Sequence, residues 1–259
     1  MKRKTIAKKL DILTPQRLES GDRPQRMRLE RRTSCVRCGK CCTASSPSLM
    51  KEDLPLFVAG VLSCDTTYTI RDGERVRSRQ DGAVYESFTE LIKLKEGEGT
   101  GGCMFYRGKE GCSIYEHRPS QCRAYKCWAP ENLYEGLEAS SLKRRDLFAS
   151  VDLLLEVMNK HDEKCSYRRL ADAFDRLAGG DEQAVEEIMD MLQYDTYARP
   201  FLQERFSVPE SALDLILGRP LAERIAEFGF RVVRQGDDYV VMPIEDTPEN
   251  EPGKEKEAE

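Results

Sequence analysis

The sequence lacks any run of about 20 consecutive apolar residues, the length that a helix needs to span the hydrocarbon core of a bilayer. We therefore expect no membrane partner. The basic start Met1–Lys4 could open a signal peptide, but Lys8 and Lys9 interrupt the apolar stretch that such a signal requires. The sequence predicts a cytoplasmic protein.

Several catalytic motifs are also missing. The sequence contains no Gly-x-Ser-x-Gly nucleophile elbow and no His-Glu-x-x-His zinc motif, and its Gly97–Gly102 stretch is not followed by the Lys-Ser/Thr pair of a phosphate-binding loop. The whole chain has two histidines and one tryptophan. These absences argue against the common P-loop, serine-hydrolase and zinc-protease classes, and they leave open whether the protein is an enzyme.

Cysteine is abundant, by contrast, with ten in 259 residues. Because the cytosol keeps thiols reduced, clustered cysteines there bind metals more often than they form disulfides. Eight of the ten fall into two blocks. The first is the sequence Cys35-Val-Arg-Cys38-Gly-Lys-Cys41-Cys42, and the second extends from Cys103 to Cys127. Ligands from both blocks would tie distant parts of the chain together.

The spacing within the first block suits a metal. Two residues between cysteines form a tight turn that directs both sulfurs to one point, and Gly39 allows a positive φ and a close backbone approach. Four thiolates around a divalent ion leave a net charge of about −2, and nearby cations would offset it and favour the thiolate form. The basic residues beside the cysteines are Arg37, Lys40, Arg107, Lys109, Arg118, Arg123 and Lys126.

The two blocks resemble the YkgJ-type CxxCxxCC cysteine-cluster family. The similarity rests on Cys35-x2-Cys38-x2-Cys41-Cys42 followed by Gly-Cys112-Ser-Ile-Tyr-Glu-x-Arg-Pro-x2-Cys122-Arg, and it covers about residues 33–130. That family is described as zinc- or iron-chelating, and the cysteine region of flagellin lysine methylases is similar too. The resemblance implies a ligand pool of eight cysteines: Cys35, Cys38, Cys41, Cys42, Cys103, Cys112, Cys122 and Cys127. Cys64 and Cys165 fall outside it.

Either zinc or iron fits eight sulfurs. They could form two four-cysteine zinc sites, two iron–sulfur clusters, or one cluster with the other thiols structural or reactive. The Cys35/Cys38/Cys41 spacing is that of bacterial ferredoxins, although Cys42 and the missing C-x3-C-P depart from that pattern. We favour an iron–sulfur cluster over Zn²⁺, with a redox or metal-handling role.

Two other functional classes stay open. A protein-modifying enzyme similar to the flagellin lysine methylases would need a nucleotide-cofactor pocket, and the sequence shows no recognisable one. An interaction module for a protein partner or a nucleic acid could use the basic residues near the start, but aromatic residues are not interleaved among them.

Composition predicts four segments. Residues 1–32 carry eleven Lys and Arg against four Asp and Glu and predict a basic flexible arm. Residues 33–130 form the cysteine-cluster metal-binding domain, and residues 131–244 a mainly helical region that ends in a β-hairpin. Residues 245–259, with seven acidic residues and two lysines, predict a disordered tail. The fold class is α+β, with a small mixed cysteine domain packed against the helical region.

Periodicity and turn signals predict the elements of the cysteine domain. A helix is expected over Lys51–Leu62, and Asp72-Gly73 predicts a hairpin turn between strands at Thr66–Ile70 and Arg75–Val76. A further strand is expected at Leu91–Leu94. His117 is expected at the surface rather than as a ligand.

The rest of the chain is predicted to form helices and a hairpin. Apolar spacing predicts one helix through Leu147–Met158 and a second through Leu170–Leu177, with a third capped by Asp181 that runs towards Pro200. Ser207 and Glu210 have the spacing of a capping box for another helix. Phe230–Arg234 and Tyr239–Met242 are expected to form a terminal hairpin, and the His161/Cys165 pair is expected to lie in a solvated connection.

Overall fold

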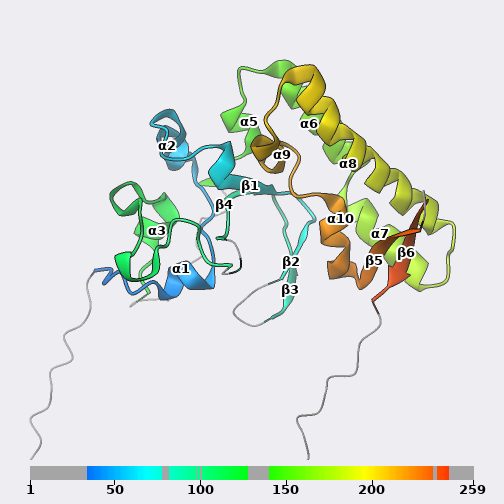
Figure 1. The fold of residues 1–259 in the computed structure, drawn as a ribbon, viewed down its shortest axis with the longest axis horizontal. Coiled ribbons are helices and arrows are strands. Elements are labelled where there is room, and N and C mark those ends of the chain that lie inside the picture. Colours follow the sequence, from blue (N-terminus) through cyan, green and yellow to red (C-terminus); the bar gives the residue numbers. More distant parts are fainter. Residues whose placement is uncertain are drawn as a thin grey trace, which may run out of the picture. The chain divides into compact units, whose positions relative to one another are not determined.

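The computed structural model describes residues 34–77, 82–97, 99, 101–127, 140–235 and 238–244. The predicted basic arm and acidic tail lie outside the described residues, as does Trp128. The described chain is α+β, as the sequence predicts (Figure 1). Its helices are α1 (Lys40–Ala44), α2 (Leu54–Val58), α3 (Ser120–Ala124), α5 (Arg144–Leu147), α6 (Asp152–Lys164), α7 (Tyr167–Ala178), α8 (Ala184–Phe206), α9 (Glu210–Ile216) and α10 (Leu221–Arg224).

The strands pair antiparallel, two by two, throughout the described residues. They are β1 (Thr67–Ile70), β2 (Arg75–Arg77), β3 (Val84–Glu86), β4 (Leu91–Leu94), β5 (Phe230–Gln235) and β6 (Asp238–Pro243). The pairs are β1 with β4, β2 with β3, and β5 with β6. The predicted strand at Leu91–Leu94 and the terminal hairpin are confirmed.

The predicted hairpin between β1 and β2 is wrong. Asp72-Gly73 does make a turn, but β1 pairs with β4 in the register Thr67↔Leu94, and β2 pairs with β3. Burial decides the outcome: all four residues of β1 are buried, whereas β2 is only half-buried. β4 carries the alternating apolar residues that can cover β1, and local turn chemistry does not outweigh that packing.

Three helical expectations also need correction. The predicted Lys51–Leu62 helix shortens to a 3₁₀ turn and α2, which ends at Val58. The Leu147–Met158 helix is divided into α5 and α6, with a break between Phe148 and Val151. The capping box at Ser207 is absent because Ser207 is the left-handed residue that ends α8, and Pro209 precedes α9.

Helix α8 continues six residues past Pro200, where the sequence predicts an end. Ala198 and Leu202, on either side of the proline, are buried in a core that includes Met158 of α6 and Leu213 of α9. This packing compensates for the backbone hydrogen bond that proline removes.

A second apolar core lies beneath the cysteine-bearing loops. It combines residues before and after those loops in sequence: Leu49, Leu62, Ile92, Leu94, Leu142 and Leu215. Cys103, Phe105 and Ile114 pack against its edge. The Thr69 hydroxyl donates a 2.6 Å hydrogen bond to the Leu215 carbonyl, which joins β1 to α9. The loops that carry the cysteines therefore rest on a core that does not consist of metal ligands.

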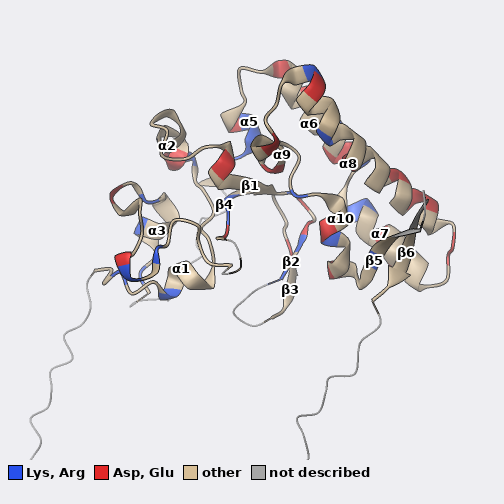
Figure 2. Ribbon diagram, in the orientation of Figure 1, with Lys and Arg blue, Asp and Glu red and all other residues tan. Residues whose placement is uncertain are grey.

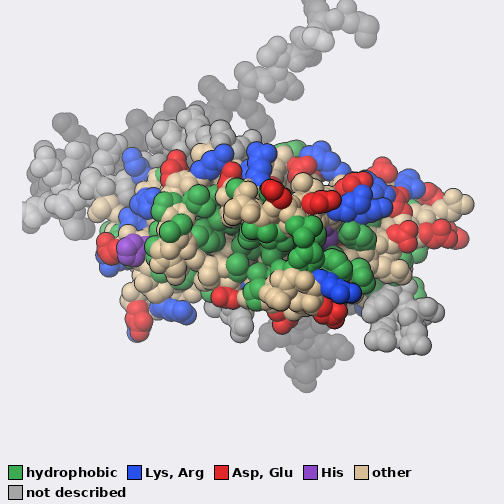
Figure 3. Space-filling view, turned by 90° about the horizontal axis from the view of Figure 1, so that it is seen from above, with side chains coloured by type: hydrophobic (Ala, Val, Ile, Leu, Met, Phe, Trp, Pro, Cys, Tyr) green, Lys and Arg blue, Asp and Glu red, His purple; other side chains and the backbone are tan. Residues whose placement is uncertain are grey.

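Apolar side chains also reach the surface. Figure 3, which views the molecule from the side where α5 and α6 lie in Figure 1, shows them gathered in the middle of this face. Val151 and Leu153, at the start of α6, are about half exposed. Apolar atoms make up more than half of an ordinary protein surface, so exposure alone does not mark a binding site. No helix among the described residues is long and apolar enough to cross a membrane.

Candidate metal centre

The first cysteine block turns into a short helix. Cys41 and Cys42 lie in α1, and Gly39 precedes it with φ at 76°, so the predicted positive φ is confirmed. A side chain at Gly39 would collide with the ring of Tyr106. The close approach that glycine permits is therefore to an aromatic ring of the second block.

The second block lies directly against the first. The Cys103 amide donates a 2.7 Å hydrogen bond to the carbonyl oxygen of Cys42. A Cβ at Gly102 would come within 2.7 Å of the same oxygen and 2.9 Å of Thr43 Cα, so glycine is needed for this contact. The two blocks are thus joined through their backbones, independently of any metal.

Five cysteines from the two blocks lie close enough to influence one another's charge: Cys41, Cys42, Cys103, Cys112 and Cys122. The sulfurs of Cys41 and Cys42 are 3.9 Å apart. The backbone of Cys112 pairs with that of Tyr106 in an isolated antiparallel β-bridge, and Cys122 lies in α3. This group brings thiols from both sequence blocks together.

The other three predicted ligands, Cys35, Cys38 and Cys127, are exposed. The Cys35 sulfur accepts a 3.4 Å hydrogen bond from the Arg37 amide. Within the described residues, which include all eight cysteines of the pool, no three Cys, His, Asp or Glu side chains are arranged to hold an ion. The structure therefore gathers five of the eight thiols without forming a closed coordination sphere.

The thiols differ in how readily they ionise. A hydrogen bond from the Cys42 thiol lowers the pKa of Cys41 to about 6, and the same interaction raises the pKa of Cys42. Burial raises the pKa of Cys122 to about 12 and also raises that of Cys103. Because a metal binds thiolates, it would have to displace protons from Cys42, Cys103 and Cys122.

Asp53 positions Cys122, and sequence reasoning missed this residue. Its buried carboxylate accepts hydrogen bonds of 2.7 Å from the Ser120 amide and hydroxyl, at the start of α3, and one of 2.9 Å from the Met50 amide. In sequence, Asp53 precedes Leu54-Pro55 and signals only the start of α2. No sequence signal links it to residue 120.

We expect Asp53→Ala to lower the free energy of unfolding by about 2–5 kcal/mol, because it leaves buried donors unpaired. Metal content should fall with it, since α3 loses the group that fixes Cys122. Asp146→Ala is the matched control: Asp146 accepts one hydrogen bond, from the Lys143 amide at the start of α5, and its loss should cost only about 1 kcal/mol. Urea denaturation and elemental analysis measure both effects; equal losses in the two variants would contradict the role of Asp53.

Two of the basic residues named from the sequence lie over one aromatic ring of the second block. The Arg37 and Arg118 guanidinium carbons lie 3.7 Å and 4.0 Å from the centroid of the Tyr115 ring. Figure 2 shows further Lys and Arg on α1 and around α3. His117 is exposed, as expected. These cations can offset the negative charge of a thiolate-ligated metal.

The expectation of a solvated connection around His161 and Cys165 is wrong. Both residues are buried at the end of α6. His161 Nδ1 lies 3.3 Å from Arg71 Nη1, which can only donate, and Nε2 lies 2.9 Å from Asp195 Oδ1. Burial lowers the pKa of His161, so a neutral ring links the two charged groups. The polar neighbours of this pair in sequence hide its burial.

Thiols gathered from two sequence blocks on a small α+β scaffold define a cysteine-cluster protein of the metal-chelating class. The chain belongs to the CxxCxxCC family, described as "Putative zinc- or iron-chelating domain", whose model matches residues 34–166. This match confirms the resemblance seen in the sequence and the expectation of zinc or iron. No curated protein and no solved structure matches the chain.

Proposed function

We propose that this chain is a cytoplasmic iron-binding protein that holds an iron–sulfur cluster through cysteines of both blocks, with a redox or metal-handling role. The observation that carries the proposal is the backbone hydrogen bond from Cys103 to Cys42, which brings Cys41 and Cys42 within electrostatic reach of Cys103 and Cys122. The ligand pool remains the eight cysteines that the family motif contains, with Cys35, Cys38 and Cys127 on exposed segments beside the group.

The donor set fits the proposed group. Iron–sulfur clusters and structural zinc are both held by cysteine thiolates, and the grouped residues offer five sulfurs, more than one four-cysteine site requires. All ten cysteines are free thiols, in keeping with a reducing compartment. Arg37, between Cys35 and Cys38 in sequence, and Arg118, which shares the Tyr115 ring with it, can supply positive charge. A bound cluster would supply one-electron chemistry, while the chain would hold it and tune its potential through charge and exposure.

Purification without oxygen tests the metal. We expect a brown protein whose broad visible absorption bleaches on reduction, with about four irons and equal acid-labile sulfide per chain for a cubane cluster. Zinc has a filled d shell and no redox chemistry, so a zinc protein would be colourless and unaffected by reductant.

Elemental analysis of the same sample separates the two readings. One or two zinc ions per chain without sulfide would overturn the iron proposal and the redox role, while keeping the chelating class. Metal-free protein that takes up neither iron nor zinc when reconstituted would overturn both.

A further inference from the structure

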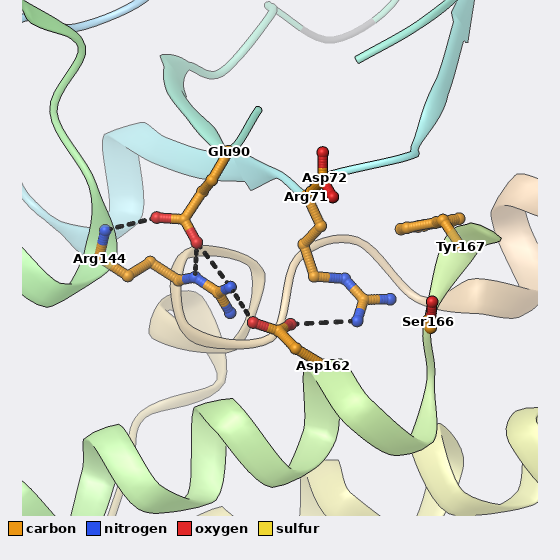
Figure 4. A pocket seen from close by; sticks show the side chains of 7 residues that line it. All are labelled: Arg71, Asp72, Glu90, Arg144, Asp162, Ser166 and Tyr167. Carbon is orange, nitrogen blue, oxygen red and sulfur yellow. Dashed lines mark hydrogen bonds and ion pairs between the residues drawn. The ribbon is translucent and has the colours of Figure 1, made fainter. Parts of the chain in front are cut away.

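A second polar site lies away from the cysteines, where α6 and α7 meet the end of β1. A cavity of about 140 Å³ opens there, lined by Arg71, Glu90, Arg144, Asp162, Ser166 and Tyr167 among others (Figure 4). A single water molecule needs about 10–15 Å³ of such space. The cavity therefore has room for a small molecule of several heavy atoms.

One of the two buried arginines is fully engaged. Arg144 donates to Glu90 Oε2 through Nε at 2.8 Å and Nη2 at 2.7 Å, to Asp162 Oδ2 at 2.5 Å, and through Nη1 to the Ile216 carbonyl at 2.6 Å. Its side chain is 4% exposed. Arg144 thus holds the acidic wall of the cavity in place and has little capacity left for a ligand.

The other arginine is engaged on one side only. Arg71 Nη1 contacts His161 and, at 3.3 Å, Asp162 Oδ1, while Nε and Nη2 are buried without a hydrogen-bond partner among the described residues. The side chain is 4% exposed. Figure 4 shows the second terminal nitrogen directed towards the space between Tyr167 and Ser166. Nε and Nη2 together form the edge with which arginine binds a carboxylate through two parallel hydrogen bonds.

The surroundings of this edge also favour an anion. Arg71 Cζ lies over the Tyr167 ring, 4.6 Å from its centroid. Ser166 is the N-cap of the 12-residue helix α7, so the positive end of the helix dipole lies at the cavity. Two independent features therefore point to a negatively charged group at the same place.

The charges of the walls limit what that group can be. Arg71 and Arg144 are already balanced by Glu90 and Asp162, and Asp72 at the rim is paired with Arg168. A ligand with two negative charges would be repelled by the carboxylates, whereas one with a single charge can use the free edge of Arg71.

We propose that this cavity binds the carboxylate of a small organic acid or of a peptide C-terminus, held by Arg71 Nε and Nη2 at the start of α7. The carboxylate oxygens accept the two hydrogen bonds that Arg71 has left, and Tyr167 covers the guanidinium face. This site is separate from the metal proposal and does not depend on it.

Titration calorimetry of the full chain at constant ionic strength tests the proposal with four probes: acetate, N-acetylglycine, acetamide and inorganic phosphate. We expect saturable one-to-one binding of acetate and N-acetylglycine, with acetamide and phosphate at least tenfold weaker. N-acetylglycine tighter than acetate would indicate a peptide terminus, and the reverse a free acid. No saturable carboxylate binding, or phosphate binding more tightly than acetate, would overturn the proposal.

Arg71→Lys keeps the positive charge but loses the two-pronged edge, so acetate affinity should fall at least tenfold. Arg176→Lys, on the exposed side of α7, is the matched control and should bind as the wild type does. A second measurement needs no variant: in protein with isotope-labelled arginine, acetate should shift one buried Nε–H resonance and slow its exchange with water. Unchanged resonances, or unchanged affinity in a folded Arg71→Lys, would contradict the site.

Discussion

Replacing Cys122 with serine should remove most of the bound metal and lower metal affinity at least tenfold, because serine is a poor ligand for zinc and iron and leaves one position open. Asp53 fixes the start of the helix that carries Cys122, so this thiol is held in place by the fold. Elemental analysis of protein purified without oxygen measures the effect.

Cys38→Ser tests the exposed part of the ligand pool. The family motif includes Cys38, and we expect a comparable loss of metal if its segment folds onto the grouped thiols when metal binds. Cys64→Ser and Cys165→Ala are the controls, since both residues lie outside the motif, and they should keep full metal content per folded chain. Equal metal content in all four variants would refute the ligand assignment.

Removing the metal should unfold the cysteine-bearing loops and leave the rest of the fold intact. Structural metal sites can contribute about 10 kcal/mol or more of apparent binding free energy, comparable to the stability of a whole domain. The loops at residues 34–45 and 101–127 carry the thiols, whereas β1 and β4 are held by the apolar core around Ile92 and Leu142. Loss of the metal should therefore unfold the loops and leave that core folded.

Hydrogen exchange before and after complete chelation distinguishes the outcomes. Faster exchange confined to the two loops is expected, with α7 and α8 unchanged. Unchanged exchange in the loops would show that the metal is not structural, and faster exchange in α7 and α8 would show that the whole fold depends on it.

The removal of the metal by chelators should depend on pH. Burial keeps Cys103 and Cys122 protonated in the metal-free protein at neutral pH, since it raises the pKa of both. Metal binding must release these protons, so acid favours the metal-free form. Chelators should strip the metal faster and more completely at about pH 6 than at about pH 8.

Local signals in the sequence predicted where the helices and strands lie better than they predicted how the strands pair. The strand at Leu91–Leu94 is where its apolar alternation places it, but its pairing with β1 depends on burial of both strands, which no turn signal encodes. The Asp72-Gly73 turn is real, yet the strands on either side separate. The break before α6 falls at residues whose spacing fits an unbroken helix, so periodicity could not reveal it.

The same contrast between local signals and long-range contacts holds for the candidate metal site. The spacing of the cysteines and the family motif predicted the ligand pool, but not which thiols lie together, because that depends on the backbone contact between Gly102 and Cys42. Asp53 and Arg71 gave no sequence signal either. Both are polar residues whose burial is decided by chain segments that lie far away in sequence.

The hydrogen bond from Cys103 to Cys42 also sets an order of events during biosynthesis. The ribosome must add residues 43–122 after Cys42 before the grouped thiols can meet, which takes roughly 4 to 16 seconds at about 5–20 residues per second. During that time Cys35, Cys38, Cys41 and Cys42 have emerged or are emerging without their partners. A site that uses thiols of both blocks can therefore be completed only late in synthesis, and the early thiols depend on the reducing power of the cell until then.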